Sequence, residues 1–344
     1  MKLVAFAWIA FACVLGGCAE SSTEPGLAAS LPKPPPEDDD LFAMVPAEAD
    51  LVLWADLGIL RSSPWTRDSF AKMASDESSD SLEQMRDLDR VVFAKVPFLR
   101  DGATILIAQG KPERERMSRV FAAGGSVEKS TYRGAEMLVR GEEALAFVGK
   151  RTAISGLTVA VRTAIDCNIG VSRAIDNESW FQRMRRQLAN AKAEVPPVAA
   201  LYVKLQPATR QALKDEMGEG EFLEEFAARI DLGSDLDAVA LGNVRTEQQA
   251  RDFAARLAER VRDARTRPIV AAFGFGSVLD AMRFTAKDTT VEAALHISQK
   301  QRAEIVDRMA IVADTMASVR KNKSPNNSDK HDPQDTKNRN EEKR

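Results

Sequence analysis

Cysteine and histidine are scarce in this sequence, which has three cysteines and two histidines among 344 residues. Histidine is the commonest general base and a frequent metal ligand, so its scarcity limits the available chemistry. His331 lies in a polar tail, and His296 lies in a predicted strand, where alternation places it beside Glu292 and Ala294. With no cysteine cluster to add ligands, we predict no metal site and no cofactor.

Aromatic residues and excess positive charge are also lacking. Aromatics make up 6% of the chain, with two tyrosines, and the formal net charge is −3. The charge provides no global basic field, which argues against a nucleic-acid partner. The few aromatics argue against a stacked sugar or nucleobase platform, although Trp54, Trp65 and Trp180 remain.

No motif of a common catalytic class is present. The chain has no Gly-x-Ser-x-Gly elbow, and 274–277 (Gly-Phe-Gly-Ser) lacks both the third glycine of a dinucleotide fingerprint and a phosphate-loop lysine. We interpret 274–277 as a flexible turn. Cys167 is far in sequence from both histidines, so we interpret it as a small apolar core residue rather than a nucleophile. We therefore predict no catalytic residues.

Two charged groups leave a functional alternative open. Asp87 and Asp89 recur as Asp235 and Asp237, and such pairs bind calcium or, more often, cap turns. Arginines 183, 185 and 186, near Trp180, could meet phosphate or lipid head groups, but on a helix they more often form a solvated face. We favour the structural interpretation for both groups.

The first residues have the pattern of a cleaved export signal. Lys2 precedes thirteen apolar residues, Leu3 to Leu15, followed by Leu15-Gly16-Gly17-Cys18. As a helix the run spans about 20 Å, short of a bilayer core of about 30 Å. The polar residues from 19 to 25 end it at once, so we predict a signal peptide at 1–17 rather than a membrane span.

The Leu15-Gly16-Gly17-Cys18 ending resembles the lipobox of bacterial lipoproteins. The resemblance implies that Cys18 receives a diacylglyceryl group, becomes the mature N-terminus and is acylated on its amine. The partner it implies is a membrane, held through the lipids on Cys18. Ala19, rather than Asp, follows the cysteine, which favours the outer membrane over the inner membrane of the bacterial envelope.

Two segments lack any periodic apolar face. The first, 18–40, joins the lipidated cysteine to a tether with a proline run at 32–36 and acidic residues at 37–40. As a coil it reaches on the order of 25–30 Å. The second, 321–344, is polar throughout and is predicted to be disordered, because it cannot bury enough surface to offset its chain entropy.

The body between these segments predicts an α+β fold. Its two predicted units, 41–195 and 196–320, meet where Val195-Pro196-Pro197 interrupts the pattern, and each is expected to be a mainly antiparallel sheet with helices packed on it. Predicted strands cover 50–57, 90–96, 103–108, 136–140, 145–148, 199–205, 236–241, 281–286 and 291–297. Predicted helices begin near Ser63 and cover 111–123, 157–166, 179–193, 208–217, 221–230, 246–265 (capped by Thr246) and 301–319.

An internal repeat at a shift of 148 residues supports two similar tandem units. Leu53 then matches Leu201, and Asp87-Leu88-Asp89-x-Val91 matches Asp235-Leu236-Asp237-x-Val239. The repeat predicts that Val91 and Val239 occupy equivalent places in the two sheets.

The stretch from Ala146-Phe147-Val148-Gly149 through 172–181 to Leu201-Tyr202-Val203 resembles the domain-of-unknown-function family 3352 of bacterial envelope proteins. That resemblance, over about residues 45–320, implies a membrane anchor with a duplicated α/β body and brings no known activity. We predict a lipid-anchored envelope protein with a non-catalytic binding or scaffolding role and an unknown envelope protein as partner. The alternatives are an envelope hydrolase using carboxylates, and a carrier for a lipid or small apolar ligand.

Overall fold

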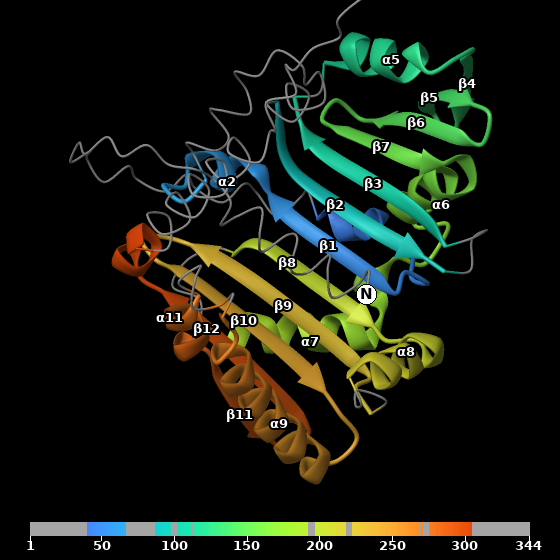
Figure 1. The fold of residues 1–344 in the computed structure, drawn as a ribbon. Helices are drawn as coiled ribbons and strands as arrows, with labels where there is room; N and C mark the ends of the chain where they lie inside the picture. Colours follow the sequence, from blue (N-terminus) through green and yellow to red (C-terminus); the bar gives the residue numbers. More distant parts are fainter. Residues whose placement is uncertain are drawn as a thin grey trace, which may run out of the picture.

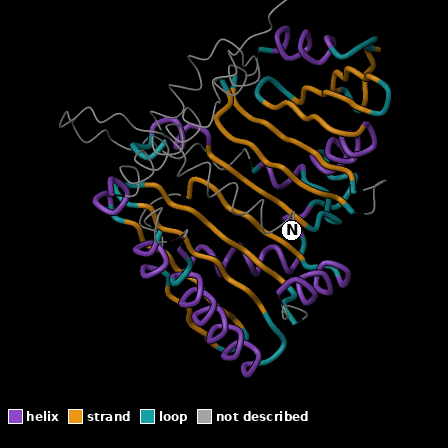
Figure 2. The backbone as a smooth tube through the Cα atoms, viewed as in Figure 1, coloured by secondary structure: helices purple, strands orange, loops and turns teal. Residues whose placement is uncertain are grey.

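The structure, a computed structural model, describes residues 40–66, 87–97, 102–111, 113–191, 197–217, 222–268, 270 and 275–304. The predicted signal peptide, Cys18, most of the tether and the tail at 321–344 lie outside the described residues. Within the described chain the α+β prediction is confirmed: helices pack on both faces of an antiparallel sheet, as Figure 2 shows.

The strands form one continuous sheet of twelve, all paired antiparallel, in the order β11-β12-β10-β9-β8-β1-β2-β3-β7-β6-β5-β4 (Figure 1). The strands are β1 (Leu51–Asp56), β2 (Leu88–Val96), β3 (Ala103–Gly110), β4 (Glu128–Tyr132), β5 (Ala135–Arg140), β6 (Glu143–Val148), β7 (Thr152–Leu157), β8 (Pro197–Lys204), β9 (Glu225–Leu232), β10 (Leu236–Asn243), β11 (Arg283–Lys287) and β12 (Thr290–Ile297).

The first strands of the two predicted units, β1 and β8, pair in the middle of this sheet, where Leu53 lies opposite Leu201. From that pair outward the strand orders are similar, β1-β2-β3-β7-β6 on one side and β8-β9-β10-β12-β11 on the other. Two expectations from the repeat are wrong. The two units share one sheet instead of each forming its own. Val91 and Val239 do not occupy equivalent places, because Val91 lies on β2, next to β1, whereas Val239 lies on β10, which β9 separates from β8.

Side-chain alternation divides the sheet into two faces. We call the face that carries Val52, Ala94, Ile105 and Tyr202 face A. It is covered by the 3₁₀ helices η2 (Leu41–Met44) and η3 (Ile175–Asn177) and by helices α6 (Thr158–Asn168) and α7 (Ser179–Asn190). The opposite face, carrying Leu53, Phe93, Leu106 and Leu201, is face B.

Face A holds the largest cluster of buried apolar side chains, which extends from β5 through the central strands to β10. An aromatic group stands at its centre. The Phe181 ring lies 4.7 Å from the Tyr202 ring and 5.1 Å from the Phe42 ring, measured between centroids, and Phe181 is fully buried. α7 is therefore bound to the middle of the sheet by ring packing, which adds to the gain from apolar burial.

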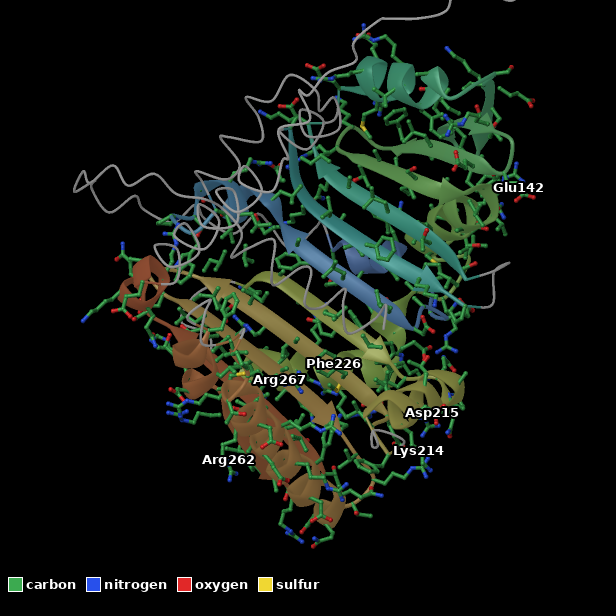
Figure 3. The ribbon with its side chains drawn as sticks, in the orientation of Figure 1. Glu142, Lys214, Asp215, Phe226, Arg262 and Arg267 are labelled. Atoms are coloured by element: carbon green, nitrogen blue, oxygen red, sulfur yellow. The ribbon has the colours of Figure 1, made fainter. Side chains whose placement is uncertain are left out.

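Face B is covered by five separate helices: α2 (Leu57–Ser62), α5 (Arg114–Ala123), α8 (Pro207–Met217), α9 (Glu247–Arg265) and α11 (Gly276–Ala281). α9 begins at its predicted cap, Thr246, and the cap is a complete capping box, in which Thr246 and Gln249 bond each other's backbone amides. In Figure 3, Phe226 lies on β9 between α8 and α9.

One predicted helix, 221–230, is wrong, because 225–232 is strand β9. Two alanines and an arginine make this stretch resemble a helix, yet burial alternates with period two, and Arg229 and Asp231 are buried on the same face. The sequence interpretation also missed β4 and β7. Gly276 and Ser277, predicted to be a flexible turn, begin helix α11.

The helix predicted to begin near Ser63 is preceded by another, α2, that the sequence interpretation missed. Asp56 caps α2, and Ser63 ends it while its hydroxyl accepts a hydrogen bond from the Trp65 amide. The continuation of that segment beyond residue 66 lies outside the described residues. Of the last predicted helix, 301–319, residues 301–304 are helical and the rest is not described. No helix in the described ranges is both long and apolar enough to cross a membrane.

Candidate functional site

The described body begins at Asp40, the last residue of the predicted tether, and it is held by side-chain contacts. One carboxylate oxygen accepts the Phe42 amide at 3.1 Å, and the other lies 3.0 Å from a guanidinium nitrogen of Arg185 on α7. Arg185 in turn stacks over the Phe42 ring, 5.0 Å from its centroid. Because Phe42 is buried in the face A core, the end of the tether is fixed to α7.

The structure brings His296 together with one of the predicted aspartate pairs. His296 Nδ1 lies 2.8 Å from an oxygen of Asp237, its cross-strand partner, and Nε2 lies 4.0 Å from Asp235. The histidine side chain is 57% exposed, so the cluster lies on an open part of face A. Sequence reasoning placed Glu292 and Ala294 beside it but missed the aspartates, because strand pairing is a non-local contact.

The other aspartate pair does not form a site. The Asp87 carbonyl accepts the Lys111 amide at 2.8 Å, and the Asp89 carboxylate pairs with Arg151 at 3.1 Å. Asp235 accepts the Gln299 amide at 3.0 Å and so supports the start of the helix at 299–304. Across the described ranges, no three His, Cys, Asp or Glu side chains are arranged to hold a metal ion.

Cys167 is a buried free thiol at the end of α6. Its sulfur lies 3.3 Å from the Arg173 carbonyl oxygen, to which the thiol donates. Burial raises its pKa to about 12, and the nearby carboxylates of Glu48, Asp166 and Asp176 add to the rise. The thiol therefore stays protonated at neutral pH, which is the state of a structural cysteine rather than a nucleophile.

The arginines of α7 make defined contacts instead of converging on one ligand. Arg183 pairs with Glu225 of β9, Arg185 pairs with Asp40, and Arg186 donates to the Gln182 carbonyl at 3.3 Å. All three remain on the outer side of the helix. The neighbouring Trp180 points inward and is buried against Phe181.

A buried ion pair beneath α7 was not predicted from the sequence. The side chains of Arg229 and Asp231 are 4% and 8% exposed, and Arg229 Nε lies 3.0 Å from each carboxylate oxygen. Burial raises the pKa of Asp231, because the lowering effect of Arg229 is smaller than the cost of desolvation. The pair locks β9 beneath α7, since Arg229 also contacts the Leu188 carbonyl at 3.5 Å.

A polar depression of about 600 Å³ lies along α5. Four cationic and two anionic side chains line it: Arg114, Arg116, Arg119, Lys150, Glu113 and Glu115. α5 buries none of its side chains fully, so the depression is shallow and open to water. Its lining does not provide the continuous apolar cavity that a carrier of the predicted kind would require.

A row of apolar side chains crosses the centre of face B. Leu201, Leu53, Phe93 and Leu106 are successive cross-strand partners on β8, β1, β2 and β3. Leu106 is 42% exposed and the other three are partly buried. Within the described residues, Leu53, Phe93 and Leu106 belong to none of the packed apolar clusters.

No family model and no curated protein matches this chain. Among solved structures the chain is similar to crystal forms of TP0453. Crystal form I has 9% identity, a TM-score of 0.46, and coverage of 79% of this chain and 98% of that one. Crystal form III has 11% identity, a TM-score of 0.47, and coverage of 79% and 99%. We draw no functional inference from a likeness at this level.

Proposed function

We propose that this chain is a lipid-anchored protein of the bacterial cell envelope with a binding or scaffolding role rather than a catalytic one. The observation that carries the proposal is the Leu15-Gly16-Gly17-Cys18 ending of a thirteen-residue apolar run. The lipids on Cys18 would attach the protein to a membrane, and Ala19 favours the outer membrane.

The folded body supports the anchoring proposal at the point where the tether ends. Asp40 is fixed to Arg185 of α7, so the tether enters the body at a defined place on its face A side. The 21 residues between Cys18 and Asp40 allow the body to stand on the order of 25–30 Å from the membrane or closer.

The contacts of the titratable groups support a non-catalytic role. Burial raises the pKa of three described carboxyl groups, those of Asp50, Asp176 and Asp231. Asp50 precedes β1, Asp176 is in η3 and Asp231 is on β9. The hydrolase alternative requires two carboxylates facing one cleft, and none of these three is among the charged groups that shift the pKa of another.

Metabolic labelling with a clickable fatty acid tests the anchor. The wild-type chain should carry the label, and Cys18→Ser should lose it, because only a thiol accepts the diacylglyceryl group. Cys13→Ser is the matched control, since Cys13 lies in the apolar run and should not be acylated. Label retained by Cys18→Ser would contradict the proposal.

The apolar row on face B favours a second candidate function, a carrier for a lipid. Four side chains about 4.8 Å apart form a strip roughly 14 Å long, on which an acyl chain can lie. Cells fed a photoactivatable fatty acid should yield crosslinks on the peptide that contains Phe93. Phe93→Asp should remove these crosslinks, whereas Val120→Asp, at an exposed site on α5, should not. Absence of crosslinks from the wild-type peptide would exclude this candidate.

A further inference from the structure

The outer side of α6 carries exposed aliphatic residues where a solvated helix would carry polar ones. Val159, Arg162, Asp166 and Ile169 follow one another at helical spacing on this side, and Val171 lies just beyond the helix end. Val159 is 46% exposed, Ile169 49% and Val171 57%. Single exposed aliphatics are common on soluble proteins. Arg162 and Asp166 separate Val159 from the others, so the exposed aliphatic pair at this end of the helix is Ile169 and Val171.

The turn that follows α6 is rigid. Gly170 adopts a φ of +74°, and its amide donates to the Cys167 carbonyl at 3.0 Å. The amides of Val171 and Ser172 both donate to the Asp166 carbonyl, at 2.8 and 3.1 Å. The backbone is therefore held so that the two aliphatic side chains, at 169 and 171, stay in water.

The helices on this side also carry exposed arginines. Arg173 at the turn is 74% exposed, and Arg183 and Arg185 of α7 are each 46% exposed, although each pairs with a carboxylate. Aliphatic side chains beside exposed arginines fit a lipid interface, because arginine heads can stay at the phosphates while aliphatic groups enter the acyl boundary.

This surface adjoins the end of the tether. Asp40 pairs with Arg185, and its charge acts on Asp176 in η3, between the turn and α7. A backbone hydrogen bond also connects the turn after α6 to the start of the body: the Ala47 amide donates to the Arg173 carbonyl at 3.0 Å. The tether therefore joins the body on the side of these helices, which puts this surface close to the chain that leads to the membrane.

We infer that the outer surface of α6 and α7 rests on the lipid membrane, with Ile169 and Val171 inserted at its interface. The inference rests on the proposed lipid anchor and goes beyond it, because an anchor alone leaves the body free to rotate. The tether keeps the body at high local concentration near the bilayer, so weak contacts suffice to orient it.

Depth-dependent fluorescence quenching tests the orientation. The full lipidated chain carrying Val171→Cys, labelled with an environment-sensitive fluorophore, is placed in vesicles of phosphatidylethanolamine, phosphatidylglycerol and a brominated phospholipid. Val120→Cys is the control: a valine of similar exposure, 41%, on α5 on face B. Cys167 should not react, because it is buried and its pKa is raised to about 12.

We expect several-fold stronger quenching at position 171 than at position 120, and a blue-shifted emission at 171 alone. Replacing Ile169 by Asp should weaken the quenching at 171, because it places a charge in the inserted aliphatic pair. Equal, weak quenching at both positions would overturn the inference. The lipid on Cys18 is read separately by mass spectrometry, so a missing lipid counts against the anchor and missing quenching against the orientation.

Discussion

The two faces of the sheet are packed in different ways. On face A, α6 and α7 share one continuous core that extends across the β1/β8 junction, with Phe181 at its centre. On face B, five helices cover several smaller clusters, and the row from Leu201 to Leu106 lies between them. Face A therefore joins the two halves of the sheet through one large core, whereas on face B the link is smaller and includes α2, which packs on both β2 and β8.

This difference indicates where the molecule tolerates change. A residue in a continuous core contacts elements of both halves, so its loss affects the whole fold. A residue over the central row of face B has few packed partners, so its loss is mainly local. Function at a surface requires exposed groups, and face B and the outer side of α6 are where the described residues leave apolar groups exposed.

The largest effect should come from the centre of face A. Phe181→Ala removes a fully buried ring that packs on Phe42 and Tyr202, and should lower the free energy of unfolding by about 3–5 kcal/mol. Urea denaturation followed by circular dichroism measures the loss. A loss below about 1 kcal/mol would show that the face A core is not continuous.

The buried ion pair should be almost as sensitive. Arg229→Met leaves the Asp231 carboxyl without its partner and should cost about 3 kcal/mol. The double variant Arg229→Met/Asp231→Leu replaces the pair by apolar groups and should recover most of that loss. If the double variant is as unstable as Arg229→Met, the loss comes from the packing of the two side chains and not from an unpaired buried charge.

The pH dependence of the same pair has a definite sign. Because the pKa of Asp231 is raised above 3.8, the folded protein binds its proton more readily than the unfolded chain does. Its contribution to the unfolding free energy therefore grows as the pH falls through the folded pKa toward 3.8, and shrinks as the pH rises. The stability of the wild type relative to Asp231→Asn should increase on acidification, as measured by urea titrations across the pH range. A constant difference would contradict the raised pKa.

A smaller effect is expected on face B. Leu53→Ala, in the central row, should cost about 1 kcal/mol, because its side chain is only partly buried and belongs to no packed cluster of the described residues. The loss of unfolding free energy can be compared directly with that of Phe181→Ala under the same conditions, since both residues lie in the middle of the molecule. Equal losses would show that the row is covered as tightly as face A.

The smallest effect concerns the C-terminal tail. Deleting residues 321–344 should change the melting temperature by no more than about a degree, because the segment has no apolar residues with which to contact either face. Differential scanning fluorimetry measures it. A fall of several degrees would show that the tail docks on the body.

Local patterns in the sequence predicted most elements of the fold. Thr246 predicted the start of α9, and the run at 50–57 predicted the central strand β1. The stretch 221–230 failed because its two-residue burial pattern depends on a buried Arg229–Asp231 pair, and arginine and aspartate normally indicate exposure.

Contacts between distant parts of the chain could not be predicted. His296 meets Asp237 only because β12 pairs with β10 in one particular register, which no local pattern specifies. The contact between Asp40 and Arg185 joins residues 145 positions apart. The exposed residues Ile169 and Val171 were also missed, since an aliphatic residue in a sequence is first assigned to the core.

The pairing of β1 with β8 has a consequence for how the chain is made. Leu53 and its partner Leu201 lie 148 positions apart, so β1 is synthesised long before the strand that covers its edge. At a synthesis rate of 5–20 residues per second that interval is roughly 7–30 s. During this time β1 presents an unpaired edge to other chains, a template for aggregation unless something protects it. A protein with this strand order should therefore depend on a chaperone during synthesis more than its final stability would suggest.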